Sequence, residues 1–257
     1  MQLMSILEQF APKKWKNLLN YLFAHLKENV TLQHLKIGEV IVEVNEFTSL
    51  KQILNEFFDL EQSNLPVQFS NSIQKGEATL SSYLWKTKFC RRIRLCELQV
   101  SNKFYAESLV IYPNFCYETP IFGTEYLKIG NKKYFGAIDF HPISKSMEYL
   151  TFLEMFPDKS VDESCFYDLD QFFSPKLWLH KRQEDFYNEY QIMVKCFLHQ
   201  YQKCLLSSQK VTQSHQNIHM KYNECMATND PAFGILKSYF DKQFAEEYIH
   251  NFLFSNK

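Results

Sequence analysis

Two acidic residues stand at positions where a carboxyl group could do proton chemistry. Glu125 follows a proline-containing loop, YETPIFGT (117–124), and begins a predicted strand, while Asp230 precedes the last predicted helix in the order Asn-Asp-Pro. A carboxyl group held in place can donate a proton to a bound substrate. The pattern alone leaves a plainer role open for each, because Glu125 could be a surface carboxylate and Asp230 a helix N-cap ahead of Pro231.

Histidine and cysteine spacing could suggest a metal centre. His215 and His219 lie four residues apart, which places them on one helix face and would suit zinc. The sequence between them, QNI, lacks the general-base glutamate of a metalloprotease, and no third ligand is evident. The seven cysteines are odd in number and form no C-x-x-C pair. We therefore expect free thiols, no iron–sulfur cluster and no bound metal.

Two short basic clusters could meet a charged partner. The first contains Arg91, Arg92 and Arg94, and the second contains 176, 181 and 182 around Trp178. Each could be a solvated face, a docking site for a small acidic protein, or a holder for ligand carboxylates. Since the net charge is −1 and no broad basic footprint exists, we expect no nucleic-acid partner.

Composition indicates one globular domain. The 257 residues are 46% hydrophobic and 22% charged, so a single domain can span 1–257, with 1–60 as an N-terminal helical extension. Six glycines and no G-x-G-x-x-G argue against a nucleotide-binding fold. No apolar run could span a bilayer and the N-terminus resembles no secretory or transit peptide, so we expect a soluble protein without a membrane partner. The 24 Phe and 15 Tyr could form core or line a pocket for a flat conjugated ligand.

The elements that must position these residues form two helical regions around a set of strands. Apolar residues at helical spacing predict helices over 15–27, 47–60, 147–156, 184–206, 215–227 and 233–254. Alternation predicts strands over 36–43, 82–86, 91–100, 105–112, 125–129 and 133–140, with a polar connection over 63–76. Gly130-Asn131 between two alternating runs indicates a hairpin. Short turns between successive strands favour an antiparallel meander, covered by helices on both faces.

Three segments, in this order, resemble the ferredoxin-dependent bilin reductases. They are YLWKTKFCRRIRLCEL (83–98), IYPNFCYETPIFGTEYLKIGNKKYFGAIDFHP (111–142) and NDPAFGILKSYFDKQFAEEYIHNFLF (229–254). The central segment has the family's order of Pro-apolar-apolar-Gly-x-acid, a hairpin, then Asp-apolar-x-Pro. The resemblance covers about residue 65 to the C-terminus, and the first sixty residues have little counterpart in it.

The resemblance implies a fold and a chemistry. The fold would be an α/β three-layer α/β/α sandwich with a central antiparallel sheet, and an open-chain tetrapyrrole would bind between that sheet and the C-terminal helices. No flavin or metal would be bound. Reduced [2Fe-2S] ferredoxin would supply electrons singly, so that the reaction passes through bilin radicals. Such an enzyme needs well-placed proton donors in a dry pocket.

Within the family, the Trp85 segment, the hairpin and Asp-Pro-Ala-x-Gly resemble members that act on biliverdin IXα. These members reduce its 15,16 methine bridge by two electrons, giving 15,16-dihydrobiliverdin in phycobilin biosynthesis. One rival is the reduction of dihydrobiliverdin to phycoerythrobilin. A rival of another class is a carrier or lyase-like module that binds bilin and changes no bond.

The resemblance also assigns site residues. Glu125 falls where the family has a catalytic aspartate, and its arm is one methylene longer, which would shift a proton donor by about 1 Å. Asp230 matches the family's second catalytic aspartate. Ser108 matches a histidine of the members that reduce a vinyl group, which argues against a four-electron, phycocyanobilin-forming enzyme. We expect the substrate-binding set to comprise Ser108, Phe122, Asp139, His141, Ser174 and Trp178.

Cellular context follows from composition and from the resemblance together. The Phe-, Tyr-, Lys- and Asn-rich composition suits an AT-rich genome. Without a transit peptide, we expect a plastid-encoded stromal protein, and a cyanobacterial cytoplasm is the alternative. We expect a monomer whose partners are ferredoxin, biliverdin IXα and the next bilin reductase, to which product would pass.

Overall fold

The computed structural model describes residues 34–37, 40–43, 49–69, 72–141, 160–161, 173–174, 177–211 and 214–256. For 34–43 and 160–161 only the backbone is described. The helices expected over 15–27 and 147–156 therefore lie outside the described residues. None of the helices in these ranges is long and apolar enough to cross a membrane.

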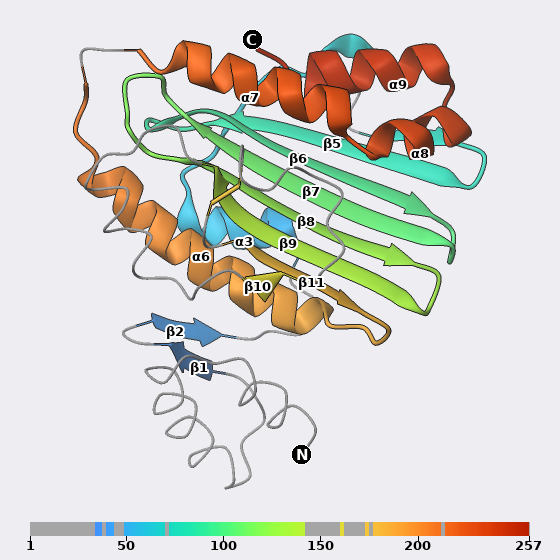
Figure 1. Ribbon diagram of the computed structural model, residues 1–257, viewed down its shortest axis with the longest axis horizontal. Coiled ribbons are helices and arrows are strands. Elements are labelled where there is room, and N and C mark those ends of the chain that lie inside the picture. Colours follow the sequence, from blue (N-terminus) through green and yellow to red (C-terminus); the bar gives the residue numbers. More distant parts are fainter. Residues whose placement is uncertain are drawn as a thin grey trace, which may run out of the picture.

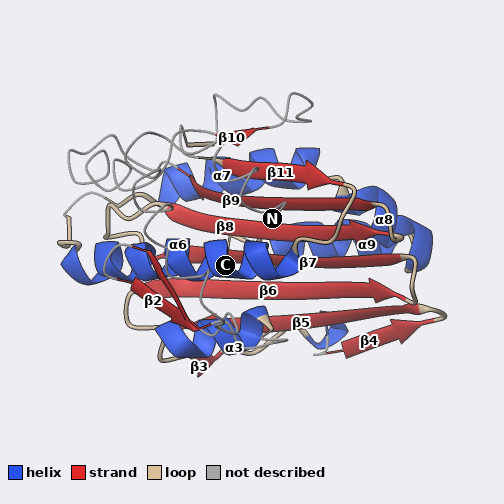
Figure 2. Ribbon diagram, turned by 90° about the horizontal axis from the view of Figure 1, so that it is seen from below, coloured by secondary structure: helices blue, strands red, loops and turns tan. Residues whose placement is uncertain are grey.

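A broad, twisted sheet is the centre of the molecule (Figure 2). Its strand order is β10-β11-β9-β8-β7-β6-β5-β3, and β4 pairs with β5. The strands are β3 (Glu61–Gln62), β4 (Ser72–Lys75), β5 (Ala78–Lys86), β6 (Cys90–Val100), β7 (Phe104–Pro113), β8 (Ile121–Ile129), β9 (Lys133–His141), β10 (Ser160–Val161) and β11 (Trp178–Arg182). A separate hairpin joins β1 (His34–Ile37) and β2 (Val40–Glu43).

The antiparallel meander is confirmed for β5 to β9. Each of these strands pairs antiparallel with the next one along the chain. Gly130 has φ +57° in the turn after β8, a backbone conformation that glycine adopts without a Cβ penalty. Among the described strands, the pair β10–β11 is parallel.

Helices cover both faces of the sheet, which confirms the three-layer architecture (Figure 1). Below it in that view lie α3 (Leu50–Phe57) and α6 (Tyr187–Ser207). Above it lie α7 (Gln216–Asn229), α8 (Ala232–Tyr239) and α9 (Lys242–Tyr248), which continues into the π-helical turn η2 (Ile249–Leu253). A 3-10 turn, η1 (Val67–Phe69), precedes β4.

Side-chain alternation divides the core into two halves. One half joins α3 and α6 to strand residues such as Ile93, Leu109 and Phe140. The other half joins α8, α9 and η2 to Leu80, Leu98 and other strand residues of opposite parity. We call these two sides of the sheet the α6 face and the α7–α9 face. A strand residue's parity therefore decides which helical layer it meets.

The expected helix over 233–254 is wrong as one continuous element. It is interrupted at Asp241, whose φ is +143° and whose side chain accepts the Phe244 N–H at 2.8 Å, capping α9. The hydrophobic spacing continues across this break because both helices pack on the same strand residues. Periodicity alone therefore concealed the turn.

Candidate active site

A row of side chains crosses the sheet on the α7–α9 face. Cys96 of β6 pairs with Ser108 of β7, and Ser108 pairs with Glu125 of β8. The neighbours of Glu125 fix its direction, because Thr124 bonds the Tyr190 hydroxyl on α6 and Tyr126 packs in the α6 half of the core. Glu125 therefore faces α7–α9, where the sequence placed the substrate.

Asp230 reaches the same face from the link between α7 and α8. Its carboxylate accepts the Ala232 N–H at 2.7 Å at the start of α8. The N-cap position of α8 is Pro231, so Asp230 is not the N-cap that the pattern alone allowed, and its carboxylate closes the turn just before the helix. Asp230 and Glu125, 105 positions apart in sequence, are close enough for their charges to interact.

The two carboxyls have environments that disfavour ionisation. Burial, reinforced by the charge of Asp230, raises the pKa of Glu125 to about 8. Burial also raises the pKa of Asp230, opposed by the Ala232 N–H and by Arg94. Because the groups interact, the pair titrates as a unit. At neutral pH this pair can hold a proton that it could donate to a bound ligand.

Arg94 is the buried cation beside these carboxyls. Its side chain is 2% exposed, and the guanidinium donates from Nε to the Leu253 carbonyl at 2.9 Å and from Nη1 to the Ser108 hydroxyl at 3.0 Å. The positive charge lowers the pKa values of both Glu125 and Asp230, against the larger effect of burial. Arg94 thus fixes Ser108 and limits how far the carboxyl pKa values rise.

The solvated-face alternative for the first arginine cluster is wrong. Arg92 is only 5% exposed and, like Arg94, is directed to a C-terminal carbonyl, that of Phe252. Arg91 stacks on the rings of Tyr112 and Phe115, with Cζ 4.8 Å and 4.4 Å from the two centroids. Arg92 and Arg94 fasten the last helical turns to β6 and Arg91 is stacked on two rings, so the cluster is not an open docking surface.

Asp139, His141 and Ser174 form a second polar group on the α7–α9 face. Asp139 accepts from the Ser174 hydroxyl at 2.6 Å and from the Ser174 N–H at 3.1 Å, and its Oδ2 lies 3.4 Å from His141 Nδ1. All three residues are buried. A Cβ built on Gly123 would lie 3.0 Å from His141 Nε2, so the imidazole covers the residue two before Glu125. The group borders the carboxyl site.

Two residues of the expected substrate-binding set lie elsewhere. Phe122 packs on Phe140 and Tyr201, with ring centroids 5.5 Å away in both cases. Trp178 packs in the same half of the core, near Phe186 and Tyr190. Both side chains are on the α6 face, so the structure does not bring them together with Glu125 and Asp230. The parity of their strands sends them to the opposite layer.

Sequence reasoning missed several polar groups on the carboxyl face. Ser82 and Tyr248 share a hydrogen bond of 2.7 Å, and Tyr222 lies 4.5 Å from His141 between ring centroids. Burial raises the pKa of the Cys96 thiol to about 12, which makes it a poor nucleophile. Strand alternation could have assigned Ser82 and Cys96 to this face, whereas the helical tyrosines required the tertiary structure.

The described residues contain no group of three or more potential ligands arranged for a metal ion. His219 is fully buried, and burial together with nearby Arg91 lowers its pKa to about 3. Its Nδ1 lies 3.4 Å from the Arg91 guanidinium, while Glu118 is 3.9 Å from His215 Nε2. The histidine pair therefore has one carboxylate neighbour, at a distance too long for coordination.

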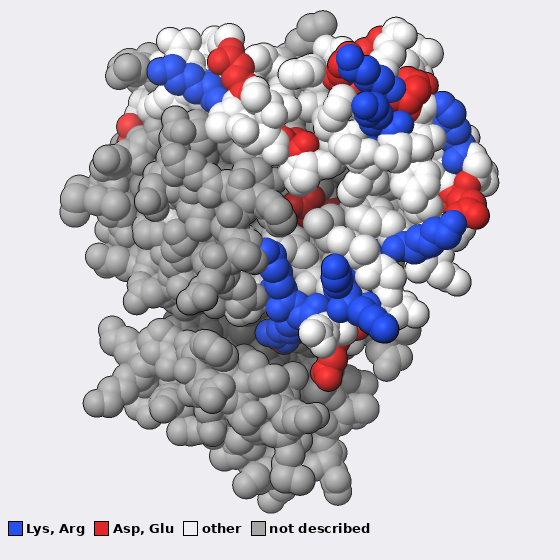
Figure 3. Space-filling view, turned by 45° about the vertical axis from the view of Figure 1, so that its right-hand side comes forward, with Lys and Arg blue, Asp and Glu red and all other residues white. Residues whose placement is uncertain are grey.

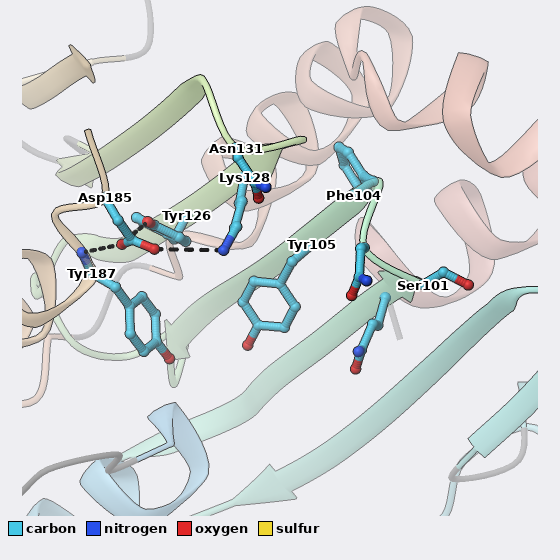
Figure 4. Close-up of a pocket in the computed structure, with 10 residues that line it drawn as sticks. Ser101, Phe104, Tyr105, Tyr126, Lys128, Asn131, Asp185 and Tyr187 are labelled. Carbon is cyan, nitrogen blue, oxygen red and sulfur yellow. Dashed lines mark hydrogen bonds and ion pairs between the residues drawn. The ribbon is translucent and has the colours of Figure 1, made fainter. Parts of the chain in front are cut away.

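A separate cavity of about 560 Å³ opens at the end of the sheet where the β6–β7 and β8–β9 turns lie (Figure 4). Its lining includes Tyr105, Tyr126, Tyr187, Lys128 and Asp185, with polar residues of the two nearby turns. Tyr105 and Tyr126 belong to the strand parity that faces α6. This cavity is therefore distinct from the carboxyl site.

The carboxyl of Glu107 lies behind the tyrosines of that cavity. It is fully buried and accepts the Tyr105 hydroxyl at 2.9 Å and the Tyr187 hydroxyl at 3.1 Å, both at Oε2. Burial raises its pKa to about 8 despite these two donors. This group links β7 to the first turn of α6, on the side of the sheet away from Glu125.

Comparison with known proteins agrees with this architecture. The family model described as ferredoxin-dependent bilin reductase matches residues 47–255. A 15,16-dihydrobiliverdin:ferredoxin oxidoreductase from Nostoc punctiforme is 27% identical, over 80% of this chain and 92% of that protein. The protein of the same description from Gloeobacter violaceus is 26% identical with the same coverage.

A solved structure has the same fold. The crystal structure of phytochromobilin synthase from tomato in complex with biliverdin superposes with a TM-score of 0.67 at 17% identity, covering 80% of this chain and 82% of the other. Fold and relatives together define an α/β/α ferredoxin-dependent oxidoreductase, and two buried carboxyls lie on one side of its sheet. The chain belongs to the ferredoxin-dependent bilin reductase family.

Proposed function

We propose that the protein reduces biliverdin IXα at its 15,16 methine bridge, giving 15,16-dihydrobiliverdin. Two electrons arrive one at a time from reduced [2Fe-2S] ferredoxin, and two protons complete the reduction. Relatives that bear the name 15,16-dihydrobiliverdin:ferredoxin oxidoreductase support the choice of bond. The position of Glu125 in the cross-strand row that faces α7–α9, with Asp230 beside it in the link between α7 and α8, is the structural observation that carries the proposal.

The environment of the carboxyls suits proton donation to a bilin radical. Each added electron makes the tetrapyrrole more basic, so a neutral carboxyl within hydrogen-bond reach can give up its proton at that moment. Glu125, with a pKa of about 8, is mostly protonated at pH 7. After donation, Arg94 stabilises the carboxylate that remains. The first proton therefore comes from the Glu125–Asp230 pair, which water must reload before the second.

The remaining polar residues would position the substrate. Ser108, between Cys96 and Glu125 in the cross-strand row, is partly exposed and its hydroxyl oxygen is held by Arg94. Asp139 and Ser174 keep His141 against Gly123, at the edge of the carboxyl site. In this proposal Ser108 contacts the bilin directly, while Asp139 and Ser174 act through His141.

Anaerobic turnover tests the proposal. The protein, biliverdin IXα and photoreduced ferredoxin should give a product with absorbance at shorter wavelength, because reduction of the 15,16 bridge shortens the conjugated system. Supplying 15,16-dihydrobiliverdin in a parallel reaction tests the rival reduction to phycoerythrobilin. Bilin binding without any spectral change under reducing conditions would instead support the carrier or lyase-like alternative.

The cellular setting completes the proposal. The enzyme would act as a monomer in a plastid stroma, or in a cyanobacterial cytoplasm, and pass its product to the next bilin reductase. It would hold no flavin and no metal of its own. Support for the setting comes from the composition and from the cyanobacterial origin of the named relatives.

A further inference from the structure

The hairpin between β8 and β9 presents an apolar side chain among lysines. Ile129 is 50% exposed, whereas Ile93, Ile111 and Ile138 in the core are fully buried. Lys128 precedes it, and Lys132 and Lys133 follow across the turn. Both Lys132 and Lys133 are exposed, and neither makes an ion pair with a described residue. We call Lys128, Ile129, Lys132 and Lys133 the hairpin patch.

Cations of the next strand extend this surface. In the register of β11 with β9, Lys181 lies opposite Phe135 and Arg182 opposite Tyr134, close to the hairpin. Figure 3 shows blue side chains gathered below the centre of this view, with red atoms at the lower edge of the group, and several blue groups at the right edge of the view also adjoin red ones. Two such compensated pairs in the structure are Lys75 with Asp241 and Lys103 with Glu77.

The acidic residues near the hairpin patch neutralise little of its positive charge, which can therefore attract an acidic protein. Lys128 lies 3.6 Å from Asp185, but both side chains are more than a third exposed, so that contact contributes little. Arg182 is held by Glu189 through two bonds of 2.6 Å and 2.9 Å. Lys132 and Lys133 thus remain as the cations that an incoming acidic protein would meet first.

The patch is also close to the carboxyl site. Glu125 and Ile129 are four residues apart on β8 and have the same parity, so both face α7–α9, about 13 Å apart along an extended strand. In Figure 3, acidic atoms are recessed in a hollow above the group of blue side chains. A carrier seated on the hairpin would therefore have its redox centre a short distance from a ligand on the α7–α9 face.

We propose that the hairpin patch is the docking surface for the acidic iron–sulfur protein that donates the electrons. The inference rests on the proposed function, since it assumes that electrons arrive from such a carrier. The lysines would steer the encounter, and Ile129 would provide a small apolar anchor that becomes buried in the complex. The occupant is an acidic protein because the exposed charge of the patch is positive.

Charge reversal on the hairpin tests the docking surface. In the full chain loaded with biliverdin, K132E/K133E should raise the KM for ferredoxin about tenfold or more at low salt, and the difference should shrink as salt screens it. The kcat at saturating ferredoxin should change little. The matched control, K221E/K237E, makes the same charge change on exposed lysines of α7 and α8 and should leave this KM unchanged.

Direct binding separates failure of this inference from failure of the proposed function. Titration calorimetry with oxidised ferredoxin, in the absence of bilin, measures docking even if the protein reduces no bilin. Loss of binding in K132E/K133E but not in K221E/K237E supports the patch. Equal binding by wild type and K132E/K133E, or no binding by wild type, overturns it.

The apolar anchor has its own test. Ile129→Ser keeps the charge of the hairpin, so the salt dependence of ferredoxin binding should keep the wild-type slope. The affinity itself should fall by about three- to tenfold, because burial of the isoleucine side chain is lost. An unchanged affinity would remove Ile129 from the docking surface, and a changed slope would show that the substitution disturbs the lysines.

Discussion

At the scale of single residues, the site depends on two carboxyls made unequal by their surroundings. Glu125 projects from a strand, and both its burial and the like charge of Asp230 disfavour its ionisation. The Asp230 carboxylate also accepts the Ala232 N–H, which favours its ionised form, whereas the charge of Arg94 favours ionisation of both groups. Unequal environments assign unequal roles, as in other enzymes with carboxyl pairs. Glu125 is better suited to hold a proton at neutral pH, and Asp230 to receive one from water and pass it on.

Asp230→Asn should separate catalysis from folding. The asparagine Oδ1 can still accept the Ala232 N–H, so α8 should retain its start and the melting temperature should change little. The side chain can no longer donate a proton, so we expect kcat to fall about 10²- to 10⁴-fold while biliverdin still binds. Bilin titration by absorbance and anaerobic turnover measure the two effects. Asp241→Asn is the matched control, because Asp241 caps α9 on the surface, and full activity is expected. Wild-type turnover by D230N would remove Asp230 from the mechanism.

Glu125→Gln should change how both activity and stability depend on pH. The folded pKa of about 8 is above the value of 4.5 for a free glutamate, so the folded state favours the protonated form. Below about pH 4.5 the carboxyl is protonated and does not lower the free energy of unfolding. As pH rises towards 8, its ionisation lowers that free energy increasingly. E125Q should melt like wild type near pH 5 and at a higher temperature at pH 9.

Activity gives the second readout for Glu125. Wild-type single-turnover rates should decline as pH rises through about 8, when the proton donor is lost. The slow residual rate of E125Q should lack that decline, whereas Glu125→Asp should keep it with a reduced rate. A wild-type rate that is flat from pH 6 to 9 would contradict the assignment of Glu125 as a donor.

At the scale of elements, the sequence predicted the strands of the meander, β5 to β9, better than the strand that lies beside it near the edge of the sheet. Strands β5 to β9 follow alternating patterns, because the residues facing α6 are mostly apolar and many of those facing α7–α9 are polar. Strand β11, WLHKR, has no such pattern, and its pairing with β9 defines it as a strand. The C-terminal break escaped detection because Asp241 interrupts the backbone without interrupting the apolar spacing.

The carboxyl site was predicted in part, for a related reason. Motif order located Glu125 and Asp230, but Arg94 in an alternating strand looked like a surface residue. Its partner, the Leu253 carbonyl, is 159 positions away, so only the tertiary fold could reveal that the charge is buried. Phe122 and Trp178 were assigned to the site through the family resemblance. Because successive side chains of a strand point to opposite faces, both of these side chains lie on the α6 face.

The contact between β7 and α6 through Glu107 yields a prediction at this scale. Glu107 is fully buried and its folded pKa is about 8, so its ionisation opposes folding above about pH 4.5 and does so fully above pH 8. Glu107→Gln keeps an acceptor for the two tyrosine hydroxyls and removes this cost. We expect the free energy of unfolding at pH 9 to rise by a few kcal/mol, at about 1.4 kcal/mol per pKa unit, and to change little at pH 5.

Denaturant unfolding at the two pH values checks the Glu107 prediction. Glu77→Gln is the control, since Glu77 makes a surface ion pair with Lys103 at 2.7 Å, and such pairs contribute under about 1 kcal/mol. If E107Q is less stable than wild type at pH 9, the two tyrosine hydroxyls stabilise the ionised carboxylate more than burial destabilises it.

At the scale of the whole molecule, the polar site lies between two layers that come from distant parts of the sequence. Strand residues provide Glu125, Ser108 and Arg94, while the C-terminal helices provide Asp230 and the carbonyls that hold Arg94. A ligand in this position touches both layers and binds only when they are assembled. Binding should therefore stabilise the native state against unfolding.

Ligand-linked stability tests that placement without requiring turnover. Biliverdin at about 100 times its Kd should stabilise the protein by about 2.7 kcal/mol, which raises the melting temperature of a chain this size by about 5–10 °C. D230N should show the same increase, because it keeps the shape of the site. Ser108→Trp should abolish it, because the indole would occupy the middle of the cross-strand row between Cys96 and Glu125. A full increase in S108W would mean that the bilin binds elsewhere, and the cavity beside Tyr105 and Tyr187 on the α6 face would then be the site to test.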